Sequence, residues 1–323
     1  MTVFDKGVFL DGCGLKFDRE VILNQDAVYL FYLNHIDWFH DVFLDLNTEG
    51  FSYGVLSNGY FYKIGVKSNR IERIVISSEK EIKKRVKAVI AYDGTEFSGF
   101  QVQKKDRSVQ GEIEKILSEC HNQETKIHGA SRTDAGVHAK RQVIHFDTDK
   151  KDTIDKWKYY FNRRLPKDIF VKSVEFVHPL FHSRFDVLRK EYRYLINIGE
   201  YNPLKRNYEW NVSNLDLDIL SKELHSIIGC FDFTSFSKGE KDSKIRTIYN
   251  AYIIRHGDTI ELIFEGDGFL RYMIRLMVFA LVKISKKELR ASMTDIINLK
   301  SRKYSTHLAP ACGLYLYDVE YSK

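Results

Sequence analysis

The feature that most constrains the fold is an alternation of strand and helix patterns, which begins near residue 85 of the 323-residue chain. Strands place successive side chains on opposite faces, whereas helices repeat their apolar positions every three to four residues. Ser108 is a typical N-cap for the first helix. The first series runs strand, helix, strand, helix, strand, over residues 85–92, 109–120, 142–146, 154–165 and 170–177.

A second series of similar order begins near Glu191. Its first strand, KEYRYLINIG, places Tyr192, Tyr194 and Ile196 on one face. The two series predict an α+β fold, in which two similar ferredoxin-like (RRM-like) modules share one mixed, mostly antiparallel sheet. The further elements expected in the second series are a helix over 215–228 that ends at Gly229, a hairpin turn at 256–258, a long helix over about 268–285 and a final strand over 314–321.

The N-terminal part has a different pattern from the rest of the chain. Asn58-Gly59 joins two aromatic-rich runs in YGVLSNGYFYKIGV, which is typical of a β-hairpin. A charged link, SSEKEIKKRVK, covers 77–87 and indicates a boundary. We therefore expect three parts: a small β-rich accessory unit over 1–80, a first α/β half over 85–188 and a second half over 189–323.

Charge is unevenly distributed between these parts. Residues 1–80 hold 8 Lys/Arg against 11 Asp/Glu, a net charge of −3, whereas the whole chain has a net charge of +6. The remainder therefore carries +9, which either indicates a polyanionic partner or describes a solvated surface. An acidic N-terminal unit would repel phosphates, so we expect it to pack on the rest of the protein or to bind a protein partner.

Composition also excludes several classes of protein. The most apolar segment, 269–284, contains Arg271 and Arg275, so no membrane span is expected. The chain starts with MTVFDKGVFLDG, which lacks the basic and apolar regions of a signal peptide, and a cytoplasmic location follows. No metal site or disulfide framework is indicated, because the cysteines form no CxxC motif and are far apart, at Cys13, Cys120, Cys230 and Cys312.

The polar stretch GASRTDAGVHAK, over 129–140, contains the strongest candidate for chemistry. Asp134 lies in a short turn with Gly136, and such a turn could simply reverse the chain. However, Arg275 lies within an apolar helix pattern and needs a sheltered anionic partner, which Asp134 could provide. Pairing would hold the carboxylate ionised, as a nucleophile requires, and Tyr192 offers an aromatic ring nearby.

The chain from about Lys87 to Tyr321 resembles the tRNA pseudouridine synthase A family through many ordered sequence blocks. This resemblance implies the pseudouridine synthase fold for that part of the chain, while residues 1–80 match nothing in the family pattern. The blocks are AYDGTEFSGFQVQ at 91–103, SVQGEIEKIL at 108–117, GASRTDAGVHA at 129–139, FHSRF at 181–185, KEYRYLI at 190–196, FDFTSFS at 231–237, GDGFLRYMIRLMV at 266–278 and GLYLYDVEY at 313–321.

The resemblance implies a role for each matched position. Asp134 matches the catalytic nucleophile, and Arg275 matches the arginine that pairs with it. Tyr192 matches the aromatic residue that stacks on the target base. The other implied substrate-binding residues are Arg132, which contacts the nucleotide and its backbone, and Leu314, which forms an apolar wall beside the base. Because the target uridine must be flipped out of a stem-loop, cationic contacts are also needed, and Arg184 suits that task.

The implied activity is the isomerisation of uridine to pseudouridine at positions 38, 39 and 40 of the tRNA anticodon stem-loop, by a homodimer without cofactor or metal. Asp134 could attack C1′ of the sugar or C6 of the base, or support a glycal-like route, and the sequence leaves all three open. The alternative is a non-catalytic tRNA-binding protein or RNA chaperone on the same fold. The N-terminal unit could additionally bind another protein.

Some residues have structural and functional interpretations side by side. His138 is expected to order its loop, whereas His182 could bind phosphate or be structural. Asp267-Gly268-Phe269 departs from the Asn-Ala-Phe common in the family and adds a negative charge near the site. A phosphate track or a solvated face could be formed by the basic residues Lys140, Arg141, Arg163 and Arg164.

Overall fold

The computed structural model describes residues 8–11, 14–17, 21–22, 50–55, 61–67, 70–77, 83–104, 106–238 and 243–322. The first half of the main body consists of β7 (Lys84–Tyr92), α2 (Val109–His121), β8 (His128–Gly129), β9 (His138–Thr148), α3 (Ile154–Arg164) and β10 (Ile169–Val177). The second half consists of β11 (Val187–Asn197), β12 (Trp210–Asn211), α4 (Leu217–His225), β13 (Gly229–Asp232), β14 (Ile245–His256), β15 (Thr259–Gly266), α5 (Met273–Ser285), α6 (Met293–Leu299) and β16 (Leu314–Tyr321).

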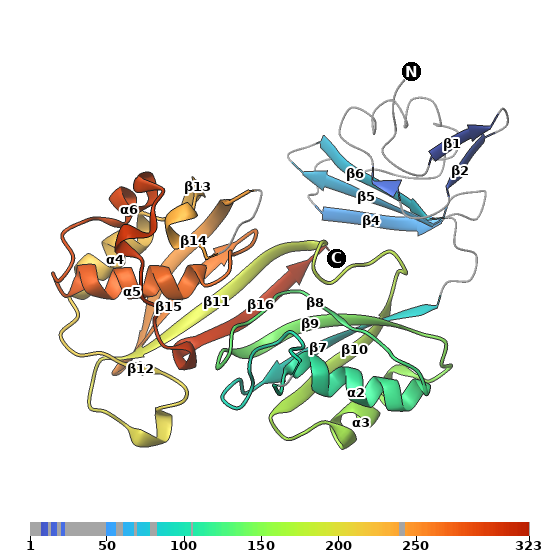
Figure 1. Ribbon diagram of the computed structural model, residues 1–323, viewed down its shortest axis with the longest axis horizontal. Coiled ribbons are helices and arrows are strands. Elements are labelled where there is room, and N and C mark those ends of the chain that lie inside the picture. Colours follow the sequence, from blue (N-terminus) through green and yellow to red (C-terminus); the bar gives the residue numbers. More distant parts are fainter. Residues whose placement is uncertain are drawn as a thin grey trace.

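The two halves share one large sheet, with the strand order β10-β7-β9-β16-β11-β15-β14-β13 (Figure 1). In each half, the first strand lies between two later strands of the same half. β7 lies between β9 and β10, and β11 lies between β15 and β16. The described pairs are antiparallel except β9 with β16 and β11 with β12. The predicted α+β class with a mixed, mostly antiparallel sheet is therefore confirmed.

The seam between the halves is the short parallel pairing of β9 with β16. Tyr315 pairs with His138, and Leu316 pairs with Ala139. His138 follows Asp134 by four residues, and Leu314 directly precedes Tyr315. The seam therefore brings the polar turn of the first half close to the last strand of the second.

Local sequence signals explain where the helices of the first half begin. The Ser108 hydroxyl accepts a hydrogen bond from Gly111 N, so Ser108 caps α2 as expected. Trp157 and Phe161 are the buried face of α3, and both rings lie edge-on to Phe146 of β9. These aromatic contacts hold α3 against the sheet.

Four short 3-10 helices also lie in the described part, at Pro203–Lys205, Thr234–Phe236, Arg302–Tyr304 and Ala311–Gly313.

The second half differs from expectation at two helix ends and by one additional helix. α5 begins at Met273 rather than near residue 268, because Met273 N bonds to Leu270 O in a turn and Tyr272 has a left-handed φ of 66°. α4 ends at His225, and Gly229, with φ 132°, instead begins β13. The unexpected α6 begins at a capping box formed by Ser292 and Asp295. Within the described ranges, no helix combines the length and apolar character needed to span a membrane.

The N-terminal strands form two small antiparallel sheets. β1 (Val8–Asp11) pairs with β2 (Gly14–Phe17), and a second sheet has the order β3 (Val21–Ile22), β6 (Arg70–Ser77), β5 (Phe61–Lys67) and β4 (Gly50–Val55). β4 and β5 pair as the expected hairpin requires, although Asn58-Gly59 lies outside the described residues. Cys13 and residues 78–82 of the charged link also lie outside them, while the end of that link forms the start of β7.

Candidate active site

Asp134 lies at the first position of a tight turn between β8 and β9. Val137 N donates a hydrogen bond to Asp134 O at 3.2 Å, and Gly136 adopts a φ of 76° inside the turn. A glycine is required there because other residues are strained at positive φ. The preceding Thr133 is fixed by Phe100 N, which donates to its carbonyl at 3.1 Å. The turn therefore reverses the chain through its backbone and leaves the Asp134 side chain available for other contacts.

The Asp134 carboxylate meets Arg275, which projects from the first turn of α5. Arg275 Nη1 lies 3.4 Å from Asp134 Oδ2, and the two side chains are 13% and 21% exposed. Arg275 Nε also donates to Ala309 O at 2.7 Å, which fixes the direction of the guanidinium. The expected contact is present, but Arg275 lies closer to the start of the helix than the expected range of about 268–285 would place it. Because α5 starts at Met273, Arg275 is near the helix end that faces the turn.

The electrostatic balance at Asp134 is set first by burial. Burial raises the pKa of the Asp134 carboxyl above its ordinary value, although the charge and hydrogen bond of Arg275 and the more distant charge of Arg271 act to lower it. Pairing therefore favours the ionised form, as expected, but desolvation outweighs it.

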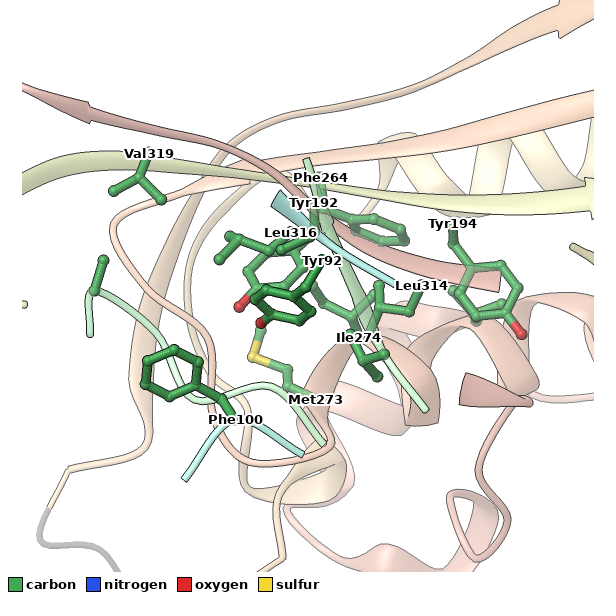
Figure 2. Packing of buried hydrophobic residues seen from close by; sticks show 14 of the residues in the cluster. Tyr92, Phe100, Tyr192, Tyr194, Phe264, Met273, Ile274, Leu314, Leu316 and Val319 are labelled. Carbon is green, nitrogen blue, oxygen red and sulfur yellow. The ribbon is translucent and has the colours of Figure 1, made fainter. Parts of the chain in front are cut away.

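Tyr192 lies beside this pair, with its side chain pointing from β11 into the interior. Its hydroxyl lies 2.7 Å from Ser131 Oγ, and its ring packs edge-on against Phe269 with centroids 5.2 Å apart. Figure 2 shows Tyr192 among buried residues that include Leu314 and Met273. Burial raises the pKa of Tyr192 to about 12, so the phenol is protonated at neutral pH.

A cleft of about 1080 Å³ joins these residues to solvent. All six site residues predicted from the sequence line it: Arg132, Asp134, Arg184, Tyr192, Arg275 and Leu314. Within the described part of the chain, Asp134 is the single carboxylate in the lining, whereas seven side chains are basic, namely Lys126, Arg132, Arg184, Lys190, Lys238, Arg271 and Arg275. A cleft with this balance attracts polyanions, and Asp134 is the one half-buried carboxylate among its described lining residues.

Arg132 and Arg184 both line this cleft and are near enough to influence each other electrostatically. Burial and the charge of Arg132 both lower the pKa of Arg184. In the described ranges, neither arginine forms an ion pair with a carboxylate. Two such guanidinium groups form a suitable contact for a phosphate, because an anion between them relieves their repulsion.

Comparison with known proteins identifies the family. A family model described as tRNA pseudouridine synthase matches residues 88–186 and 225–322, more than half of the chain. The chain belongs to the tRNA pseudouridine synthase family. A tRNA pseudouridine synthase A from Anoxybacillus flavithermus is 42% identical over 245 residues, covering 74% of this chain and 99% of the relative. One from Brevibacillus brevis is 40% identical over 246 residues, covering 74% of this chain and 100% of the relative. This is a family of isomerases.

Asp267, which departs from the pattern of the tRNA pseudouridine synthase family, does not line the cleft. Its carboxylate accepts a hydrogen bond from Thr247 N at 3.1 Å, and its own N–H donates to Thr247 O at 3.1 Å. The added negative charge is therefore used to join β14 to the segment after β15.

His138 has a structural role in this member of the family. Its Nδ1 accepts a hydrogen bond from Gly94 N at 3.0 Å, and its Nε2 donates to Asn207 O at 2.9 Å. Both nitrogens are thus used by the backbone of two loops, and burial lowers the pKa of this imidazole. His182, by contrast, lines the cleft, although its Nδ1 accepts from Arg184 N at 3.1 Å.

The four basic residues considered as a phosphate track do not join the cleft lining. Arg141 pairs with Asp318 at 2.8 Å, and Arg164 pairs with Glu119 at 2.7 Å. Lys140 is exposed and also lies outside the lining. The positive charge of the cleft therefore comes from other residues.

Several cleft residues were not identified from the sequence. Lys190 lies on the same face of β11 as Tyr192, and its Nζ donates to Ala130 O at 2.8 Å. The two-residue period of a strand would have placed Lys190 on the same face as Tyr192, so this residue could have been found from the sequence. Ser131 directly precedes the motif arginine, but its contact with Tyr192 depends on the tertiary fold. Arg271 was within the expected helix, whereas it lies in the loop before α5.

Proposed function

We propose that this protein isomerises uridine to pseudouridine in the anticodon stem-loop of tRNA, at positions 38, 39 and 40, with Asp134 as the catalytic nucleophile. The observation that carries this proposal is the position of Asp134, the single carboxylate among the described residues lining a cleft with seven basic side chains. Membership in the tRNA pseudouridine synthase family supports the reaction and the substrate class.

The reaction breaks the N1–C1′ glycosidic bond, rotates the uracil and forms a C5–C1′ bond. N1 gains a proton and C5 loses one, so the atoms balance without a co-reactant. Asp134 could attack C1′, attack C6 or stabilise positive charge on the ribose in a glycal-like route. Each route requires the ionised carboxylate, which Arg275 favours from 3.4 Å.

The detached base must be retained while it turns. Tyr192 and Phe269 offer aromatic surfaces, and Leu314 offers an aliphatic surface, on the wall of the cleft beside Asp134. A uracil stacked against these side chains would rotate within one plane, so that C5 replaces N1 opposite C1′ of the ribose. The high pKa of Tyr192, about 12, assigns its ring rather than a phenolate to this task.

A uridine inside a stem-loop must leave the base stack before it reaches Asp134. Such flipping costs a few kcal/mol, which contacts to the displaced nucleotide offset. Arg132 and Arg184, which lack carboxylate partners in the described part, are suited to bind its phosphates. We propose a homodimer in which both subunits contact each tRNA, as the family resemblance implies.

The decisive experiment is mass-spectrometric mapping of pseudouridine in unmodified tRNA incubated with the purified protein. We expect product at one or more of positions 38–40, and no product with Asp134→Asn. Tight tRNA binding without product from the wild-type protein would instead favour the RNA-chaperone alternative. Product confined to other positions would contradict the proposed substrate site.

A further inference from the structure

The N-terminal sheet contacts the chain segment that connects β10 to β11, residues 178–186. Lys63 of β5 forms an ion pair with Asp186, and their side chains are 3% and 1% exposed. The Tyr53 hydroxyl of β4 donates a hydrogen bond to the other carboxylate oxygen of Asp186. Two residues of the N-terminal unit therefore bind one buried carboxylate of the main body.

Further contacts make this junction more than one ion pair. The Tyr53 ring lies 5.2 Å from the His178 ring, centroid to centroid, and Phe51 N donates to Ser322 Oγ at 2.9 Å. Lys63 Nζ also lies 4.7 Å from the centre of the Phe51 ring. Such contacts support a buried ion pair, whose desolvation is costly unless both charges are well coordinated.

Asp186 also determines the shape of the segment that it ends. Its carboxylate accepts a hydrogen bond from His182 N at 2.7 Å, and its own N–H donates to His182 O at 3.1 Å. The turn between these two residues carries Arg184 and Phe185, which both line the cleft. One side of this short turn thus meets the N-terminal sheet, and the other side meets the cleft.

From this arrangement we infer that the N-terminal sheet positions the Arg184 side of the cleft for tRNA through the Lys63–Asp186 ion pair. Lys63 is a positioning residue, because it acts on the substrate through Asp186 and the 182–186 turn. The inference rests on the proposed function insofar as tRNA is the ligand. It assigns to the accessory unit a part in substrate binding that its acidic composition does not suggest.

The main test compares Lys63→Met with Lys84→Met in the full-length protein. Both changes remove one positive charge outside the cleft lining, but Lys63 pairs with Asp186 whereas Lys84 packs over the Phe176 ring. We expect Lys63→Met to raise the KM for tRNA and the Kd of the complex by about threefold to tenfold, with kcat nearly unchanged. Lys84→Met should leave both constants near their wild-type values. Equal effects of the two variants would reduce the inference to general electrostatics and overturn it.

A double-mutant cycle with Arg184→Ala tests whether Lys63 acts through the turn. If it does, Lys63→Met should weaken tRNA binding by less than about twofold when Arg184 is already absent. Additive effects in the double variant would contradict the inference. Tyr53→Phe is the milder variant, for use if Lys63→Met does not fold, and it should shift Kd in the same direction because it removes one bond to Asp186.

Hydrogen exchange separates this inference from the proposed function, because it needs no RNA. In Lys63→Met, the amides of His182 and Asp186 should exchange faster than in Lys84→Met. Unchanged exchange at both amides would overturn the positioning role even if catalysis is as proposed. If these amides exchange faster in Lys63→Met but the wild-type protein binds no tRNA, the positioning of the turn would be supported and the proposed substrate contradicted.

Discussion

The guanidinium of Arg275 lies 3.4 Å from the carboxylate of Asp134, and yet the pKa of this carboxyl is above its ordinary value. The cause is burial, which penalises the charged form more strongly than Arg275 supports it. A carboxylate that is partly desolvated and incompletely neutralised is a better nucleophile than one held in a tight, fully solvated ion pair. Arg275 therefore holds the carboxylate in place, while burial leaves its charge incompletely neutralised, as the proposed nucleophilic role requires.

Asp134→Asn should lower the rate of pseudouridine formation by about 10³-fold or more, as expected for removal of a nucleophile. An amide has nearly the same shape, so tRNA affinity should change little. The measurement is single-turnover product formation with filter binding in parallel. Substantial turnover by the Asn variant would remove Asp134 from the proposed role.

The stability of the same variant follows from the raised pKa of Asp134. The native state binds this proton more tightly than the unfolded chain does, so the stabilisation is present at low pH and is lost as pH rises through the native pKa. At neutral pH the ionised carboxylate therefore opposes folding. We expect the Asn variant to be at least as stable as the wild type at pH 7 by thermal unfolding. In acid, its stability relative to the wild type should be lower than at pH 7.

Activity should fall as the pH falls through the native pKa of Asp134, with a midpoint above the ordinary value of 3.8. Arg275→Met should move this acidic limb to higher pH, because the variant lacks the main group that lowers the pKa. Arg271→Met should move it in the same direction by less, since Arg271 contributes at a distance. The pH profile of kcat/KM, measured for the wild type and both variants, gives the three midpoints. An acidic limb that does not move in Arg275→Met would contradict its assignment to Asp134.

Substitutions of Tyr192 should separate its ring from its hydroxyl. Tyr192→Leu should lower kcat/KM by about tenfold to a hundredfold, since losing a stacked aromatic costs about 1–3 kcal/mol per base. Tyr192→Phe keeps the ring and its contact with Phe269, and should cost about tenfold or less. Ser131→Ala is the matched control, because it removes the partner of the hydroxyl alone. A Phe variant as impaired as the Leu variant would instead show that the phenol is essential.

Binding of tRNA should weaken steeply with salt, because basic side chains release counterions from phosphates. Arg132→Ala and Arg184→Ala should each reduce the slope of log K against log salt concentration by about one. Arg255→Ala, at the exposed end of β14, provides a control outside the cleft. Titrations at several salt concentrations measure the slopes, and a dissociation constant independent of salt would exclude the electrostatic contribution.

Elements with strong local signals were predicted well from the sequence. The Ser108 cap, the tight Gly257-Asp258 turn and the last strand all agree with the structure. The predicted start of α5 was wrong because Phe269 continues the apolar spacing of the helix. The left-handed backbone of Tyr272 interrupts the helix, and apolar periodicity does not reveal such a conformation. α6 was missed although its capping box was present in the sequence, because the helix has only 7 residues.

The candidate site was predicted more fully than the contacts that support it. The motif residues Asp134 and Tyr192 and the apolar setting of Arg275 were visible in the sequence, and all three line the cleft. The support given by Ala309 to Arg275 is a backbone contact, and no side-chain pattern encodes such a contact. Lys63 lies 123 positions from Asp186, so their pairing appears only once the two sheets have packed. The division into three domains remains a prediction.

The seam between β9 and β16 has a consequence for synthesis of the protein. Because β16 follows the other described strands along the chain, Leu314 and the pairing that holds Tyr315 beside His138 are absent until residues 314–321 have emerged from the ribosome. A chain released early could fold its first half and carry the RTDAG turn, but it would lack the wall beside Asp134. Incomplete translation products are therefore expected to be inactive, even when they contain Asp134, the proposed nucleophile.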